Sequence, residues 1–232
     1  MKVLVGLSGG VDSSVAAFLL KQEGFDVTAG FMRNWEDDDG SPYCSVKEDF
    51  LDAAQVADKL GINLVQMNFA KQYKDKVFSY FLDELNNGKT PNPDIYCNKF
   101  IKFKEFTNYA IENDFEAVAT GHYSKVQVID KEHFLCKSYD QSKDQTYFLS
   151  QVEKNVFKNI KFPLGNLLKT DVRKIAEAEN LVTYDKKDST GICFIGERPF
   201  PEFLKNYLPE DHGEIVDENN EVIGEHRGLY FY

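Results

Sequence analysis

A glycine- and serine-rich run near the N-terminus has the residue types that bind phosphate. It reads Gly-Leu-Ser-Gly-Gly-Val-Asp-Ser-Ser over residues 6–14 and directly follows an apolar stretch, residues 3–5. A strand, a glycine-rich turn and a helix in this order direct backbone N–H groups and a helix N-terminus at an anion. Gly9 and Gly10 let the backbone approach a phosphate closely and adopt positive φ where the turn requires it. We therefore expect a phosphate-binding loop, with an ordinary glycine-rich turn as the alternative.

Asp12 distinguishes this loop from a simple phosphate cradle, because its negative charge opposes that of the ligand. A carboxylate is expected there if a divalent cation accompanies the phosphates, since Mg²⁺ binds a carboxylate together with phosphate oxygens. No Gly-Lys-Ser/Thr sequence follows the glycines, so the loop is not of the Walker type.

Cys97 follows a proline-stiffened loop and is expected to stand just before a helix that carries Lys99 and Lys102. A helix N-terminus and nearby ammonium groups lower the pKa of a thiol and favour the reactive thiolate. Asp94, three residues earlier, could act as a general acid or base. The alternative is a buried structural cysteine.

Cys193 lies in a second candidate loop, with glycine on both sides and Lys186, Lys187 and Arg198 nearby. Such a loop can expose its thiol to a partner, and the cations favour the thiolate. A buried structural cysteine is again the alternative, and the sequence alone pairs neither thiol with the other.

The first half of the chain alternates strands and helices, which predicts an α/β fold with a doubly wound, mostly parallel sheet. Ligands of such sheets bind beyond the carboxyl ends of the strands, where we expect the phosphate loop, Met32 and Gly121 to meet. Strands are expected at residues 3–7, 27–32, 63–69 and 116–120, and helices at 12–23, 45–60, 71–85 and 100–112.

The second half is more irregular and ends in a β-rich segment. Hairpins are expected at 125–137 and 214–224, and helices at 145–152, 171–179 and 200–207. The α/β alternation stops near Arg198, which predicts a catalytic domain over 1–198 and the start of a small β-rich domain over 199–232.

The bulk composition indicates a globular protein with one substantial core. The net charge of −11 argues against broad, nonspecific binding of nucleic acid. The four cysteines form no Cys-x-x-Cys pair, which argues against structural zinc, and we expect Cys44 and Cys136 to be structural. The phosphate loop leaves no room for a leader peptide, and no apolar run could span a membrane, so we expect a cytoplasmic protein.

Lysine and arginine residues gather in four groups, each of which we expect to be a solvated helix face. The groups are Lys99, Lys102 and Lys104; Lys154, Lys158 and Lys161; Lys169, Arg173 and Lys174; and Lys186 and Lys187.

Several segments together resemble the bacterial tRNA-specific 2-thiouridylases, a family of ATP pyrophosphatases. The matching segments are SGGVDSSVAA from Ser8, FMRNW from Phe31, TPNPDIYCNKFIKF from Thr90, ATGHY from Ala119, KDQTYFL from Lys143, FPLG from Phe162, KKDSTGICFIGER from Lys186 and GEHRGL from Gly224. They occur in the family's order and extend over almost the whole chain. The pair of cysteine motifs separates this family from other ATP pyrophosphatases.

The resemblance implies that ATP, with Mg²⁺ through its phosphates and Asp12, activates C2 of the wobble uridine of tRNA, whose oxygen is replaced by sulfur. No tightly bound metal or organic cofactor is expected. The implied ATP-binding residues are Gly6, Leu7, Ser8, Gly9, Gly10, Val11, Asp12, Ser13, Met32 and Gly121.

The resemblance also assigns the sulfur chemistry and the partners. Cys193 would carry a persulfide received from a sulfur-relay protein, and Cys97 would release the sulfur and end in a disulfide with Cys193. Asp94 would be the acid or base. The protein would act as a monomer, without a membrane. The implied tRNA-contacting residues are Asn92, Pro93, Asp94, His122, Lys143, Asp144 and Gln145.

The last residues, 228–232, fall inside a motif that the family continues, so we expect a C-terminally truncated chain with weak tRNA affinity. Two other readings remain open. An amide ligase or amidotransferase of the same superfamily would need no essential cysteine. A non-catalytic nucleotide-binding or sulfur-carrier module would bind ATP without tRNA-dependent release of pyrophosphate.

Overall fold

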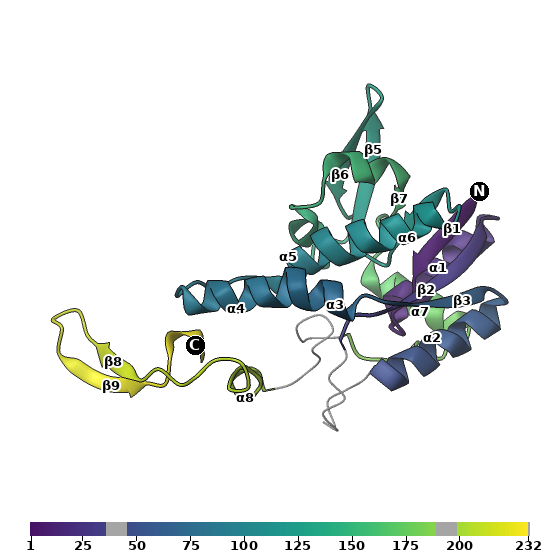
Figure 1. Ribbon diagram of the computed structural model, residues 1–232. Helices are drawn as coiled ribbons and strands as arrows, with labels where there is room; N and C mark the ends of the chain where they lie inside the picture. Colours follow the sequence, from purple (N-terminus) through teal and green to yellow (C-terminus); the bar gives the residue numbers. More distant parts are fainter. Residues whose placement is uncertain (36–45, 189–198, 232) are drawn as a thin grey trace.

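Five parallel strands form the central sheet of the computed structural model (Figure 1), which describes residues 1–35, 46–188 and 199–231. Their order is β3-β2-β1-β4-β7. Pairing is parallel throughout, with Val5 beside Ala29 on one side and beside Ala119 on the other. The strands are β1 (Lys2–Gly6), β2 (Asp26–Arg33), β3 (Asn63–Asn68), β4 (Ala117–Ala119) and β7 (Ile160–Lys161).

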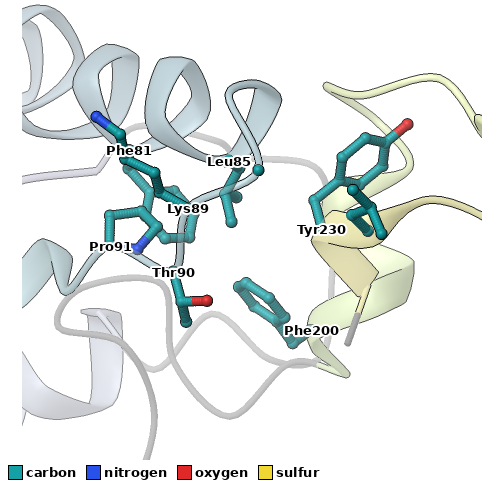
Figure 2. A pocket seen from close by; sticks show the side chains of 9 residues that line it. Phe81, Leu85, Lys89, Thr90, Pro91, Phe200 and Tyr230 are labelled. Atoms are coloured by element: carbon teal, nitrogen blue, oxygen red, sulfur yellow. The ribbon is translucent and has the colours of Figure 1, made fainter. Parts of the chain in front are cut away.

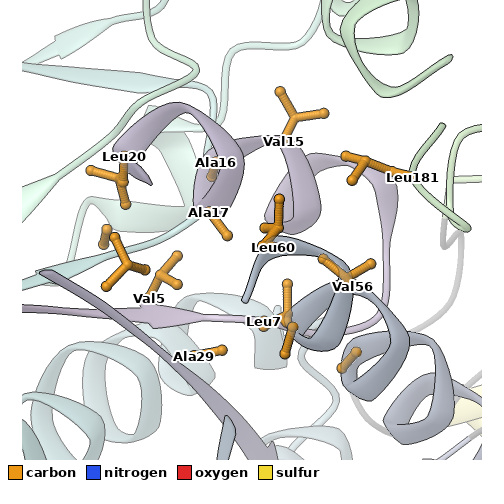
Figure 3. Close-up of a cluster of buried hydrophobic side chains, with 14 of the residues drawn as sticks. Val5, Leu7, Val15, Ala16, Ala17, Leu20, Ala29, Val56, Leu60 and Leu181 are labelled. Carbon is orange, nitrogen blue, oxygen red and sulfur yellow. The ribbon is translucent and has the colours of Figure 1, made fainter. Parts of the chain in front are cut away.

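Alternating side chains of the sheet enter two separate cores, because successive residues of a strand point to opposite faces. Val3 and Val5 of β1 join one apolar cluster, whereas Leu4 between them joins the other. The first cluster packs the sheet against α1 (Val11–Gln22), α2 (Val46–Leu60) and α7 (Lys169–Ala178). Figure 3 shows the part of it between the sheet, α1 and α2. Burial on both faces explains the continuous apolar run of residues 3–5 in β1.

The second face is covered by two long helical segments that change their hydrogen-bond pattern along the way. α3 (Ala70–Tyr73), the π-helical η1 (Lys74–Phe78) and α4 (Ser79–Asn86) form the first. α5 (Pro93–Cys97), the π-helical η2 (Asn98–Glu105) and α6 (Phe106–Glu112) form the second. Helices on both faces confirm the predicted doubly wound α/β fold.

Two hairpins are confirmed close to their predicted positions. β5 (Ser124–Ile129) pairs with β6 (Glu132–Lys137), and β8 (Gly213–Val216) pairs with β9 (Val222–His226). Figure 1 shows the β8–β9 hairpin at the far end of the molecule from β1. The remaining elements are the 3₁₀ helices η3 (Thr146–Leu149), η4 (Lys154–Asn159) and η5 (Leu229–Phe231), and α8 (Phe200–Leu204).

Of the C-terminal segment, α8 and the residues of η5 pack against the second core, whereas the β8–β9 hairpin extends away from it (Figure 1). Phe203 of α8 is 4% exposed and lies 6.2 Å, between ring centroids, from Trp35 at the end of β2. Trp35 also makes edge contacts with Tyr73 and Phe78. This aromatic cluster joins α8 to the second core.

Local sequence explains where the predicted elements differ from the observed ones. The helix expected at 145–152 is a single 3₁₀ turn, and β7 was not predicted because two residues carry no periodic signal. The helix expected from residue 100 begins at Pro93, because the Asn92 side chain accepts a hydrogen bond from the Asp94 N–H (3.0 Å). An asparagine N-cap followed by proline at the first helical position is a strong start signal.

Candidate nucleotide-binding site and thiol sites

The phosphate loop lies at the switch point of the sheet, where the chain leaves β1 and the neighbouring strands β2 and β4 run on either side. In such sheets ligands bind in the crevice at this point. Gly9 has φ +77°, a left-handed conformation that favours glycine, and an added Cβ there would lie 2.2 Å from the Asp49 carbonyl oxygen of α2. Gly10 is extended, at φ −103°, and is the N-cap of α1.

Serine hydroxyls hold the turn in shape from within. Ser13 Oγ and Ser14 Oγ donate to the Gly10 carbonyl oxygen at 3.0 and 2.8 Å, and the Ser8 N–H donates to Ser13 Oγ at 3.2 Å. The first N–H groups of α1 have no partner within the helix and point out of its N-terminus. The loop therefore combines a fixed backbone with free donors, the geometry that binds phosphate.

Asp12 is held by two side chains from distant parts of the chain. Both of its carboxylate oxygens accept from Lys169 Nζ at 2.7 Å, and Oδ1 also accepts from Tyr123 Oη at 2.8 Å. Burial, and then the charge of Asp12, raises the pKa of Tyr123 above its usual value, so the phenol stays a donor. The prediction of a solvated face was wrong for Lys169, which is 8% exposed and lies at the start of α7.

Lys169 also contacts Asp188 at 2.8 Å, and Asp188 in turn pairs with Lys143 (3.0 Å) and Arg173 (2.8 Å). Burial alone would raise the pKa of Asp188, but the hydrogen bonds and charges of Lys169 and Lys143 outweigh it and lower the pKa to about 2. The carboxylate is thus ionised at neutral pH. In the sequence it precedes Cys193 by five positions.

Two further contacts fasten the segment that ends at Asp188. Thr183 Oγ1 donates to Ser14 Oγ at 3.0 Å, next to the phosphate loop. Lys186 binds Asp49 (2.8 Å) and Asp52 (2.5 Å) of α2, so the prediction of a solvated face was wrong for this lysine too. The segment that leads toward Cys193 is therefore attached to α1 and to α2, the two helices beside the phosphate loop.

Met32 and Gly121 lie next to the phosphate loop, at the carboxyl ends of β2 and β4. An added Cβ on Gly121 would lie 2.8 Å from the Ser13 backbone nitrogen, so only glycine fits this close approach. The terminal methyl of Met32 lies 3.4 Å from a Cβ built on Gly6. Asn34, which the sequence did not single out, is 1% exposed, and neither atom of its amide has a partner among the described residues. The sequence signal that could have identified Asn34 is an asparagine placed directly after a buried strand.

Asn92, Pro93, Asp94 and Cys97 form the first turns of a helix rather than the loop before one. Cys97 is the last residue of α5, and the chain continues helically into η2. The expectation that Cys97 stands just before a helix is therefore wrong, and the contribution of a helix N-terminus to its thiolate no longer applies. Its side chain is fully buried, and the Lys99 ammonium lies over the Phe100 ring at 5.1 Å. Cys193 and Cys44 fall outside the described residues.

The candidate tRNA-contacting residues near β4 make internal hydrogen bonds. His122 is 9% exposed and shares a hydrogen bond of 2.8 Å with Thr120 Oγ1. Burial, and then the charge of Lys102, holds the pKa of His122 well below its usual value, so the imidazole is neutral. Asp144 accepts from the Ser138 N–H (2.8 Å). Gln145 accepts from the Tyr123 N–H (2.9 Å), and Lys143 pairs with Asp188.

A cavity of about 80 Å³ opens beside the segment that precedes Asn92, away from the phosphate loop. Figure 2 shows Phe81 and Leu85 of α4 on one side and Phe200 and Tyr230 on the other. Its lining contains none of the expected ATP-binding residues: Phe81, Leu85, Gly88, Lys89, Thr90, Pro91, Phe200, Leu229 and Tyr230.

Residues 1–35, 46–188 and 199–231 contain neither a cluster of metal-ligating side chains nor a helix that could span a membrane. No group of three or more His, Cys, Asp or Glu side chains is placed there to hold a metal ion. No helix in these ranges is both long and apolar enough to cross a membrane.

Comparison with protein families identifies the two parts of the chain. A family model described as the tRNA methyl transferase HUP domain matches residues 1–197, and one described as the tRNA methyl transferase PRC-barrel domain matches residues 201–232. The chain belongs to this family. Within the family, the curated relatives are named tRNA-specific 2-thiouridylase MnmA.

Three of these relatives show how much is shared. The protein of Chromobacterium violaceum is 54% identical over 231 residues, which cover 100% of this chain and 60% of the relative. That of Neisseria meningitidis is 55% identical, covering 99% and 63%, and that of Pediococcus pentosaceus is 53% identical, covering 100% and 62%. The chain therefore spans about 60% of the length of the relatives it matches.

Solved structures support the fold assignment. A 4-thiouridine synthetase–RNA complex with bound ATP matches with a TM-score of 0.54 at 18% identity, covering 88% of this chain and 49% of that one. An NMN synthetase from Francisella tularensis matches with a TM-score of 0.50 at 20% identity, covering 81% and 66%. Together with the HUP family model, these matches confirm the Rossmann-like fold of the ATP pyrophosphatases.

Proposed function

We propose that this protein catalyses the ATP-dependent 2-thiolation of the wobble uridine of tRNA. The observation that carries the proposal is the phosphate loop at the switch point of the sheet, in a chain 54% identical to proteins named tRNA-specific 2-thiouridylase. The ATP-binding residues would be those from Gly6 to Ser13, with Met32 and Gly121 beside the adenosine. The catalytic domain would comprise residues 1–198, and the β-rich domain would begin at residue 199.

Activation comes first, because the C2 oxygen of uracil is a poor leaving group. The oxygen attacks the α-phosphorus of ATP, a new O–P bond forms, and the bond to the bridging oxygen breaks to release pyrophosphate. Asp94 would accept the N3 proton of the base as it reacts. The donors of the phosphate loop stabilise the charge that develops on the phosphates.

Sulfur transfer follows on the activated C2. The terminal sulfur of a Cys193 persulfide attacks C2, and AMP leaves with the former uracil oxygen. The Cys97 thiolate then attacks Cys193 Sγ and breaks the S–S bond. The electron pair of that bond stays on the sulfur attached to C2, and Cys97 and Cys193 end as a disulfide. An external thiol reduces the disulfide before the next turnover. Because Cys97 is fully buried, this step requires the surroundings of α5 to open.

Mg²⁺ fits the site as a companion of the phosphates, since Asp12 supplies one carboxylate beside the phosphate loop and its side chain is 32% exposed. When bound, the ion would neutralise charge on the triphosphate. tRNA would be contacted by Asn92, Pro93 and Asp94 around the base, and by the segment from Lys143 to Gln145 and His122. We place the protein in the cytoplasm, as a monomer that receives sulfur from a relay protein.

The test measures 2-thiouridine by mass spectrometry after incubation with ATP, Mg²⁺, a persulfide donor and unmodified tRNA, because free sulfide could attack the activated C2 without passing through Cys193. Wild type is compared with Cys193→Ala, Cys97→Ala and Asp94→Asn, with Cys136→Ala on the hairpin strand β6 as the matched control. A full-length relative serves as the positive control. Product from wild type and Cys136→Ala alone supports the proposal. Full product from Cys193→Ala would falsify the persulfide assignment. If the protein instead forms an amide at the expense of ATP, it is an amide ligase or amidotransferase and not a thiouridylase.

A further inference from the structure

Lys169 supplies a positive charge to a phosphate loop whose own sequence contains none. Its Nζ lies 2.7 Å from both carboxylate oxygens of Asp12, the second residue of α1. The ammonium therefore stands beside the first turn of α1, where the N–H groups that bind phosphate emerge. Walker loops carry a lysine for this purpose within the loop itself. Here a lysine reaches the same kind of place from a helix that begins 157 positions later.

Lys169 is held in position both through its backbone and through its side-chain ammonium. Its backbone N–H donates to the Asp140 carboxylate at 2.9 Å, and Asp140 is itself only 9% exposed. Its ammonium is bound by Asp188 (2.8 Å) as well as by Asp12. Asp188 keeps Lys143 and Arg173 as further partners, so it can hold Lys169 while Asp12 changes partner.

We propose that Lys169 is a phosphate-contacting residue of the nucleotide site, with Asp12 as its partner in the absence of nucleotide and Asp188 as its permanent anchor. When a triphosphate enters, its oxygens offer the ammonium more negative charge than one carboxylate does, and Asp12 becomes available to a divalent cation. No covalent bond changes in this exchange. The proposal rests on ATP binding by the phosphate loop, which is part of the proposed function.

The same network gives the site a connection to the thiol segment. Asp188 ends the described segment that leads toward Cys193, and Lys143 belongs to the motif expected to contact tRNA. A nucleotide that takes the Lys169 ammonium from Asp12 leaves Asp188 as its remaining carboxylate partner in this network. Occupancy of the ATP site would in this way tighten the anchor of the segment that delivers sulfur.

Nucleotide affinity without Mg²⁺ separates a phosphate contact from a merely structural role. Removing Lys169 alone would leave Asp12 without its cationic partner, with only the neutral Tyr123 hydroxyl bound to it, and its charge would repel ATP even if Lys169 never touched phosphate. The comparison is therefore between Asp12→Asn and the double variant Asp12→Asn/Lys169→Met, both titrated in EDTA with ATP and with adenosine. Lys174→Met, on the exposed side of α7, is the matched control, and thermal unfolding verifies that every variant is folded.

We expect the double variant to bind ATP about tenfold to a hundredfold more weakly than Asp12→Asn, the value of one charge-assisted hydrogen bond. Adenosine affinity should stay the same, Lys174→Met should bind both ligands like wild type, and Asp12→Asn/Lys169→Arg should regain most of the ATP affinity. Equal ATP affinity in Asp12→Asn and the double variant would overturn the assignment. If wild type binds no ATP even when Mg²⁺ is added, the proposed function fails first, and the two failures remain distinguishable.

Discussion

The two adjacent glycines of the phosphate loop should respond very differently to substitution by alanine. Gly9 has φ +77°, and a Cβ on it would lie 2.2 Å from the Asp49 carbonyl oxygen, which is backbone and cannot rotate away. Gly10 has φ −103°, and its Cβ would meet only Ser8 Oγ at 3.6 Å, an ordinary contact. Gly9→Ala and Gly10→Ala are therefore a matched pair that differs in conformation and space, not in chemistry.

The magnitude follows from two separate penalties. A left-handed conformation costs a residue with a Cβ about 1–2 kcal/mol, and forcing a methyl group into filled space costs about 1–3 kcal/mol more. We expect Gly9→Ala to lower the free energy of unfolding by about 2–5 kcal/mol, which corresponds to a fall in Tm of roughly 4–20 °C for a protein of this size. Gly10→Ala should stay within about 0.5 kcal/mol of wild type.

Urea and thermal unfolding followed by circular dichroism measure both variants. A Gly9→Ala protein as stable as Gly10→Ala would refute the left-handed turn and the contact between the loop and α2. Equal, large losses in both would refute the claim that Gly10 is extended and unobstructed.

Three further predictions concern other parts of the molecule. Phe203→Ala should destabilise the protein by about 3–5 kcal/mol and red-shift the fluorescence of Trp35, the chain's single tryptophan, and an unchanged emission maximum would contradict the packing of α8 on the second core. The lowered pKa of Asp188, about 2 against a usual 3.8, contributes stability that is present above pH 3.8 and lost as the pH falls toward 2. Between pH 3.8 and 2, the free energy of unfolding should therefore fall less steeply with decreasing pH in Asp188→Asn than in wild type. The exposed control Asp185→Asn should follow wild type. Iodoacetamide followed by peptide mass spectrometry should modify Cys136 at least about tenfold faster than the fully buried Cys97, and equal rates would contradict the burial of α5.

The parts of the fold that the sequence predicts well are those with strong local signals. The apolar run before the glycines, the positive φ of Gly9 and the Asp-Lys turn of the β5–β6 hairpin, where Asp130 and Lys131 both have positive φ, are all encoded within a few residues. The doubly wound sheet follows from alternating elements whose strands are buried on both faces.

The parts that the sequence does not predict depend on contacts between distant residues. Lys169 looks like any charged residue of a solvated helix, and its pairing with Asp12 across 157 positions has no local signal. The sequence pattern misplaces Cys97 for a different reason: two prolines within three residues suggest a loop, whereas Asn92 and Pro93 are the N-cap and first residue of α5. Asn34 has no local signal beyond its place after a strand, because its burial without a hydrogen-bond partner among the described residues is a tertiary feature.

The most direct test of the central claim follows the oxygen that sulfur replaces. tRNA labelled with ¹⁸O at C2 of the wobble uridine is incubated with the protein, ATP, Mg²⁺ and a sulfide source, and AMP is analysed by mass spectrometry. Activation by adenylation predicts one ¹⁸O atom in AMP for each 2-thiouridine formed, because the uracil oxygen attacks the α-phosphorus and leaves with it. AMP without the label, in a reaction that forms 2-thiouridine, would contradict activation by adenylation.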